Sequence, residues 1–163
     1  MIEEARDMKN LHHCDEVDRR IMGVLQVDAS ISHNELAQTV GASTASCWRR
    51  IKALERAGIL TRSIRLINPA MIGLGVNVLC NIRMRSHAPE HRKAFEDFVN
   101  ERPEIIESFS MSGEWDYLLR IVVADVAEYN LFLMDVLLAQ ATVAGAASHF
   151  ALSMTKYTTA IPL

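Results

Sequence analysis

The spacing of apolar residues changes at one short segment, and this change is the strongest constraint on the fold. Before Asn68-Pro69, from Val17 to Leu54, apolar side chains recur every three or four residues, as on amphipathic helices. After Gly73-Leu74-Gly75 they alternate with polar side chains, as on strands that bury one face. Proline and glycine at the join are typical of an inter-domain linker. We therefore predict two domains within the 163 residues, a small helical one and a mixed one.

Two short helices open the first domain. The first carries an apolar stripe from Val17 to Leu25, and Asp15 stands where its N-cap is expected. The second begins at Ser32-His33-Asn34-Glu35, a capping-box pattern in which two side chains bond each other's backbone amides. Gly41 is expected to end this helix, because the position after a helix often takes the left-handed conformation that glycine adopts without strain.

A third helix follows that tight turn. Ser43 or Thr44 caps it, and it ends before Gly58. Its core-facing residues lie within about 60° of one another around the helix axis: Cys47, Ile51 and Leu54. The opposite arc holds Ala45, Trp48, Arg49, Lys52 and Arg56.

Basic side chains concentrate on this third helix and just beyond it. The chain carries a net charge of −3, yet residues 49–65 hold six Lys or Arg side chains and one Glu. A compact basic patch on an acidic protein is typical of a surface that binds a polyanion. The same charges also fit a solvated helix face followed by an ordinary strand, and charge alone leaves both interpretations open.

The second and third helices, with the tight turn between them, have helix-turn-helix spacing. In that motif the second helix enters the major groove with its N-terminal residues first. We therefore predict double-stranded DNA as a partner, contacted by Ser43, Thr44, Ser46, Trp48, Arg49, Arg50, Lys52 and Arg56. Of these, Arg50, Lys52 and Arg56 are expected to meet mostly phosphates, which position the protein without specifying a sequence.

The second domain is predicted to contain four strands and two helices. The strands are expected at residues 76–85, 105–112, 117–123 and 146–155, and the helices at 89–102 and 125–137. The order β-α-β-β-α-β is the ferredoxin-like arrangement, so the fold class is α+β. The expected segments are an N-terminal extension (1–14), a winged helix-turn-helix domain (15–60), a wing or linker (61–75) and the ferredoxin-like domain (76–163).

One face of this sheet is expected to lack a helical cover, because two helices can cover only one face. Leu79, Leu118 and Val122 lie on the other face between polar residues. An apolar stripe on an uncovered face indicates a partner chain. We therefore predict a homodimer.

Several stretches of sequence carry a family resemblance, among them Asp15-Glu16-Val17-Asp18-Arg19-Arg20-Ile21 and Val40-Gly41-Ala42-Ser43. Cys47-Trp48-Arg49-Arg50-Ile51-Lys52-Ala53-Leu54-Glu55, with Gly58-Ile59-Leu60, resembles the recognition helix and exit of the Lrp/AsnC (feast/famine) transcription regulators. Ser112-Gly113-Glu114-Trp115-Asp116-Tyr117-Leu118-Leu119 resembles the hairpin of that family's regulatory domain. The resemblance extends over about residues 14–156.

The resemblance implies an effector, a free amino acid, bound by a RAM-type second domain, and dimers that assemble into an octamer of four dimers. The binding loop would be the hairpin turn around Gly113. Backbone amides there suit an α-carboxylate, and Asp116 suits an α-ammonium. The implied effector-binding residues are Met111, Gly113, Glu114, Trp115, Asp116, Tyr117, Ala146, Ser148 and His149.

Two classes of function remain open. The leading hypothesis is a sequence-specific, effector-controlled DNA-binding regulator. The alternative is an enzyme on the same two-domain frame, similar to the siroheme decarboxylases. No nucleophile–base constellation stands out, so no catalytic residue, metal ligand or cofactor besides the effector is predicted. No apolar run approaches the roughly 20 residues that span a bilayer, and three scattered cysteines predict a reducing, cytoplasmic location.

Overall fold

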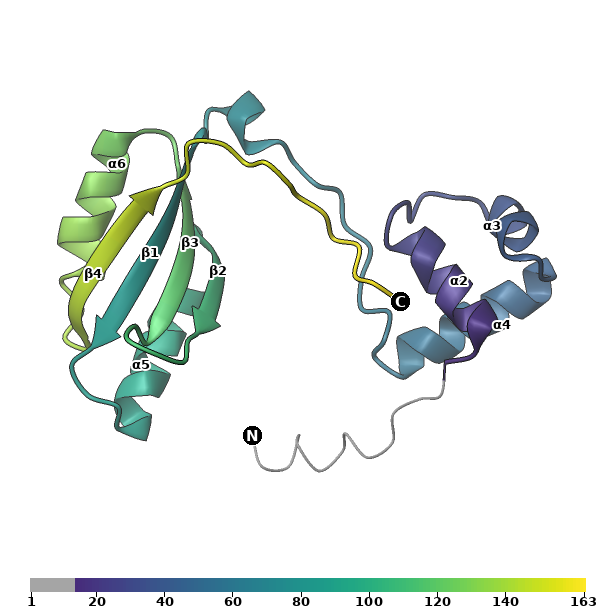
Figure 1. Ribbon diagram of the computed structural model, residues 1–163, viewed down its shortest axis with the longest axis horizontal. Coiled ribbons are helices and arrows are strands. Elements are labelled where there is room, and N and C mark those ends of the chain that lie inside the picture. Colours follow the sequence, from purple (N-terminus) through teal and green to yellow (C-terminus); the bar gives the residue numbers. More distant parts are fainter. Residues whose placement is uncertain (1–13) are drawn as a thin grey trace. The chain divides into compact units, whose positions relative to one another are not determined.

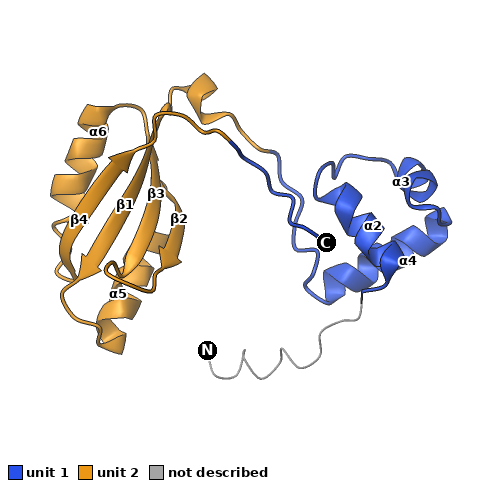
Figure 2. Cartoon of the chain, viewed as in Figure 1, with its two compact units in different colours: residues 1–65, 156–163 blue, residues 66–155 orange. Residues whose placement is uncertain are grey.

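The computed structural model describes residues 14–163, so the predicted N-terminal extension lies outside the described residues except for Cys14. The chain divides into two compact units (Figure 2). The first contains the residues up to Arg65 together with 156–163, and the second contains 66–155. The C-terminal segment therefore belongs with the helical unit, whereas the sequence had placed it in the second domain.

The helical unit contains the three expected helices (Figure 1), α2 (Glu16–Leu25), α3 (His33–Val40) and α4 (Thr44–Arg56). Each begins at a side-chain cap, because Asp15, Ser32 and Ser43 accept hydrogen bonds from amides in the first turn of their helices. The caps of α2 and α3 are reciprocal capping boxes. The sequence predictions for the helix starts are confirmed.

A small apolar core holds these helices together. Its fully covered side chains come from all three helices: Ile21, Leu36, Val40, Cys47 and Leu54. Gly41 lies between α3 and α4 with φ of 69°, a conformation that strains other residues. The tight turn predicted there is therefore confirmed, and it directs α4 away from α3 as a helix-turn-helix requires.

The C-terminal segment, residues 156–163, is hydrogen-bonded to the helical unit through the side chain of Gln26, the C-cap residue of α2. The amide Nε2 of Gln26 donates to the Ile161 carbonyl over 3.0 Å, and the Ile161 amide donates back to Oε1 over 2.9 Å. The hydroxyl of Thr159 also donates to the Gln26 carbonyl. These contacts connect residues 133 to 135 positions apart in the sequence, which explains the unit boundary.

The segment that follows α4 contains no strand. Residues 61–68 are extended and exposed, and only a 3₁₀ turn, η1 (Pro69–Ile72), precedes the second unit. Ile64 and Leu66 alternate with polar residues, a pattern that is typical of a strand. Within one chain no neighbouring strand supplies the hydrogen bonds that a strand needs, so the alternation alone does not form one.

The second unit has the predicted β-α-β-β-α-β order. Its strands are β1 (Val76–Met84), β2 (Ile105–Ser110), β3 (Tyr117–Val123) and β4 (Val143–Phe150), and its helices are α5 (Pro89–Asn100) and α6 (Val126–Leu131). The sheet order is β2-β3-β1-β4, with every neighbouring pair antiparallel. This is the ferredoxin-like topology.

One face of the sheet packs against both helices. The shared core joins buried residues of β1 and β3, such as Ile82 and Leu119, to Phe95 of α5 and Tyr129 of α6. On the opposite face, Leu79 and Phe109 remain 40% and 50% exposed. Val122 is already buried within the single chain, so it does not extend the exposed stripe as predicted.

Several element boundaries differ from the sequence prediction, and β4 begins at Val143, three residues earlier than expected. β2 ends at Ser110 and β4 ends at Phe150, before the alternation in the sequence stops. The second helix continues beyond Leu131 as a π-helix, η2 (Phe132–Leu137), in which the Leu138 amide donates to the Leu133 carbonyl. Among residues 14–163, none of the helices combines the length and apolar character that crossing a bilayer demands.

Candidate DNA interface and effector loop

The outer face of α4 presents the basic residues that the sequence singled out. Cys47, Ile51 and Leu54 lie in the core, so the opposite arc of this 13-residue helix faces away from it. Trp48, Arg49, Lys52 and Arg56 are exposed there, and together with Glu55 they line a shallow hollow. We call these five residues the α4 outer face. Within the described part of the helical unit, this helix therefore exposes a cationic surface that suits a polyanion.

The N-terminal turn of α4 is held in place by its own polar side chains. Ser43 Oγ accepts a hydrogen bond from the Ser46 amide over 3.2 Å. The Thr44 hydroxyl donates to Asn34 Oδ1 on α3 over 3.1 Å. Asn34 is a residue that the sequence reasoning missed, although it lies inside the quoted capping-box stretch. Its contact fixes α3 against the helix end that would meet base edges first.

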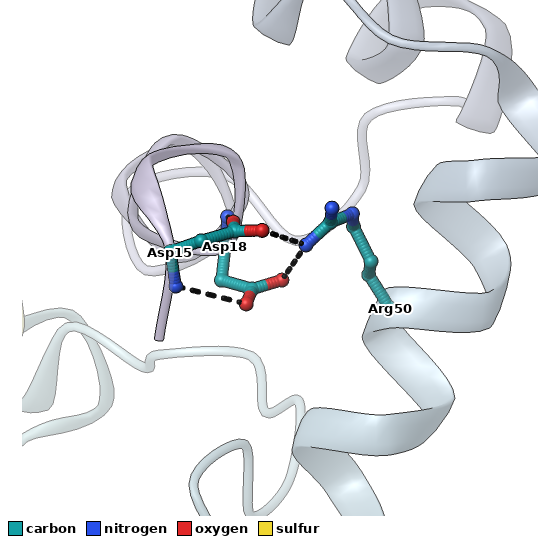
Figure 3. A network of polar contacts seen from close by, with 3 residues as sticks. All are labelled: Asp15, Asp18 and Arg50. Atoms are coloured by element: carbon teal, nitrogen blue, oxygen red, sulfur yellow. Dashed lines mark hydrogen bonds and ion pairs between the residues drawn. The ribbon is translucent and has the colours of Figure 1, made fainter. Parts of the chain in front are cut away.

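Arg50 is not part of the α4 outer face (Figure 3). Its Nη1 atom donates to Oδ2 of Asp15, the N-cap residue of α2, over 2.7 Å and to Oδ1 of Asp18 in α2 over 2.8 Å. Asp18 is 6% exposed, the only buried charged residue among those described. The amide of Asp18, and then the guanidinium of Arg50, lower the pKa of the Asp15 carboxyl. Arg50 therefore links α4 to α2, and the expectation that it meets phosphates does not fit its position.

The remaining cations of the α4 outer face make weaker contacts. Lys52 pairs with Glu55 over 2.6 Å, and Arg56 Nε donates to the Lys52 carbonyl over 3.0 Å. Both contacts are exposed, and exposed contacts of this kind add little stability, so Lys52 and Arg56 can give them up to bind another anion. Arg49 has no ion-pair or hydrogen-bond partner within residues 14–163. It is the cation of this face with the most freedom to bind another molecule.

The hairpin between β2 and β3 forms the second region of interest. The Met111 amide donates to the Asp116 carbonyl over 2.8 Å and closes the turn. Gly113 has φ of 123°, and the space where a Cβ would stand is open. L side chains rarely adopt this backbone conformation, so it favours glycine at the turn.

The acidic residues of this turn are already paired. The carboxylate of Asp116 accepts a hydrogen bond from the Met84 amide and contacts His87 Nε2, each over 2.7 Å. Glu114 pairs with Arg83 over 2.7 Å, and the Arg83 guanidinium lies 4.8 Å from the centre of the Trp115 ring. His87 and Arg83 were not among the predicted effector residues. The turn is thus tied to β1 and to the segment that follows it.

The other predicted effector residues divide between the two faces of the sheet. Tyr117 points into the helix-covered core, where burial and a hydrogen bond to Glu96 raise its pKa to about 12. Ser148 also faces that core and bonds the Tyr129 hydroxyl, while Ala146 packs against the core nearby. His149 is exposed opposite Leu79 on the uncovered face.

Of these residues, Tyr117 is buried in the core, and Ala146 and Ser148 are half-buried on the same side of the sheet. Burial raises the pKa of the neighbouring Cys80 thiol. Within residues 14–163, no three His, Cys, Asp or Glu side chains gather as they would around a metal ion.

Comparison with known families places both units. The model of the Lrp/AsnC ligand binding domain matches residues 77–161, and that of a winged helix-turn-helix DNA-binding domain matches residues 15–61. The chain belongs to the Lrp/AsnC family. The DNA-binding transcriptional activator DecR of Escherichia coli (strain K12) is 36% identical over 149 residues, covering 91% of this chain and 98% of DecR. The glutamate uptake regulatory protein of Zymomonas mobilis is also 36% identical, covering 91% and 90%.

Solved structures of this family share the fold. An AsnC family transcriptional regulator from Agrobacterium tumefaciens is 40% identical with a TM-score of 0.87, covering 91% of this chain and 97% of its own. A transcriptional regulator from Neisseria meningitidis in complex with L-Met is 34% identical with a TM-score of 0.88, covering 91% and 96%. This Lrp/AsnC protein is thus a DNA-binding transcriptional regulator with a ligand-binding domain, and the enzyme alternative has no support.

Proposed function

We propose that this Lrp/AsnC protein binds DNA through the α4 outer face and the first turn of α4. The observation that carries the proposal is the exposed Arg49 beside Lys52 and Arg56, on a helix whose other side is buried. Ser43, Thr44 and Ser46 lie at the end of α4 that would enter the groove first. The cations of this face would contact phosphates and base edges there.

The test compares Arg49→Ala with Arg19→Ala by fluorescence anisotropy on a DNA site selected with the wild-type protein. Arg19 is exposed on α2, so the two variants lose the same charge from different helices. We expect Arg49→Ala to weaken binding about tenfold or more, in the range of a lost base contact. Arg19→Ala should bind like the wild type. Equal affinities for the two variants would remove α4 from the interface.

We further propose that the ligand is an amino acid bound at the hairpin turn of residues 111–116. The L-Met complex of the Neisseria meningitidis relative supports an amino acid as the class of ligand. Backbone amides near Gly113 would hold the α-carboxylate, and Asp116 would pair with the α-ammonium. Because Asp116 contacts His87 over 2.7 Å, the ammonium would share or replace that contact.

A thermal-shift screen of the twenty amino acids tests this proposal, because a ligand of the folded state raises the Tm. At least one amino acid should raise the Tm of the wild type. Asp116→Ala should abolish the shift, whereas His87→Ala should keep it, since only the competing partner is removed. An undiminished shift in Asp116→Ala would show that the turn is not the site.

The uncovered sheet face supports a homodimer as the unit of assembly. Leu79, Leu118 and Phe109 present apolar surface there, and Arg120 lies among them paired with Glu107 over 3.2 Å. A second copy would remove this surface from water. We propose that four such dimers form an octamer, and that binding of the effector favours one packing of the dimers over another. Because its proposed partner is DNA, we also propose that the protein acts in the cytoplasm.

A further inference from the structure

The α4 outer face includes one large apolar side chain. Trp48 is 54% exposed, although Cys47, Ile51 and Leu54 on the other side of the same helix are almost fully covered. An exposed indole contributes nothing to the core of the helical unit. We propose that Trp48 determines sequence specificity by contacting the methyl group of a thymine in the major groove. This inference rests on the proposed placement of α4 in DNA.

The surroundings of Trp48 indicate what it binds. The hollow beside it is lined by Arg49, Lys52, Glu55 and Arg56. The lining therefore combines one aromatic ring with three cationic side chains, and the one acid, Glu55, is paired with Lys52 over 2.6 Å. A ligand that complements this hollow would present a small apolar group surrounded by negative charge. The thymine edge of a DNA major groove, flanked by phosphates, has this combination.

The chemistry of the bases makes thymine the specific choice. The C5-methyl of thymine is the apolar group by which A·T pairs are recognised in the major groove, where the other groups of the four bases are mainly donors and acceptors. The indole offers an apolar ring and one N–H donor. Trp48 lies in the N-terminal half of α4, five positions after the Ser43 cap, within the part of the helix that docks first.

The experiment replaces thymine by deoxyuridine, which removes only the methyl group. In the selected DNA site, each thymine is replaced singly, and affinity is measured by anisotropy for the wild type and for Trp48→Ala. At one or two positions the wild type should bind about three- to fivefold more weakly, the effect of one buried methyl. The same replacements should leave the affinity of Trp48→Ala unchanged. Salt is lowered until the weaker variant binds measurably.

Matched variants complete the test. Val27→Ala removes another exposed apolar side chain of the same unit, 76% exposed, and should keep the sensitivity to uracil. Uracil replacements that are neutral for the wild type, or equally harmful to both proteins, would overturn the assignment. A change in oligomeric mass in Trp48→Ala without loss of uracil sensitivity would also overturn it, in favour of a contact between copies. If Arg49→Ala still weakens binding in either case, the DNA-binding role of α4 stands independently.

Discussion

Neighbouring arginines on α4 should respond to alanine substitution in opposite ways. Arg50 joins α4 to α2 through Asp15 and Asp18, whereas Arg49 has no partner within residues 14–163. Arg50→Ala leaves the 6% exposed Asp18 carboxylate without its counter-charge. The expected loss of stability is about 1–2 kcal/mol, between the value of an exposed ion pair and that of a hydrogen bond to a buried charge.

Thermal unfolding followed by circular dichroism measures this loss. For a unit of this size, 1–2 kcal/mol corresponds to a Tm lowered by roughly 4–16 °C. Arg49→Ala provides the matched control, because it removes the same charge one position away. Its Tm should stay within the small range expected of a surface substitution, about 0.5 kcal/mol.

DNA affinity, measured well below both melting temperatures, should show the reverse order. Arg49→Ala should bind weakly, and Arg50→Ala should bind nearly as well as the wild type. The reasoning fails if Arg50→Ala melts like the wild type and loses as much affinity as Arg49→Ala. That result would mean that Arg50 leaves its aspartate partners to contact DNA.

Three further predictions follow from single contacts. The pKa of Asp15 is lowered in the folded state, so the ionised carboxylate stabilises the fold at neutral pH. This stabilisation is lost as the pH falls below about 4 and the carboxylate is protonated. Asp15→Asn should therefore show a smaller decrease of Tm on acidification, measured as Tm over a series of pH values. Gln26→Ala removes two of the three hydrogen bonds to the C-terminal segment, so trypsin should cut after Lys156 faster than in the wild type, and unchanged cleavage kinetics would argue against the fastening. Leu79→Glu places a charge on the uncovered sheet face, so light scattering should detect folded monomers, and a mass equal to that of the wild type would exclude this face as the dimer interface.

The parts of the fold that depend on neighbours in sequence were predictable. Ser32 and Glu35 are three residues apart, and their capping box follows from that spacing alone. Alternation along β1 likewise puts Cys80 and Ile82 on one face of the strand, and the structure buries that face. Such local patterns also fixed the β-α-β-β-α-β order, because each element has its own period.

The contacts that the sequence did not reveal join distant segments. In the sequence, nothing distinguishes Arg50 from the other cations of this basic helix, because its partners Asp15 and Asp18 lie 35 and 32 residues earlier. The fastening of Ile161 to Gln26 spans 135 residues and has no local signal. By contrast, alternation along β4 could have separated Ser148 from His149, because neighbouring strand residues point to opposite faces.

The salt dependence of DNA binding tests the central claim, that the α4 outer face contacts DNA, most directly. The slope of log Kd against log salt concentration is compared for the wild type, the Lys52→Ala/Arg56→Ala double variant and the Arg19→Ala control. Each lost phosphate contact should reduce the slope by about 0.9, so the double variant should lose roughly 2 and the control nothing. A double variant with the slope of the wild type would contradict the account.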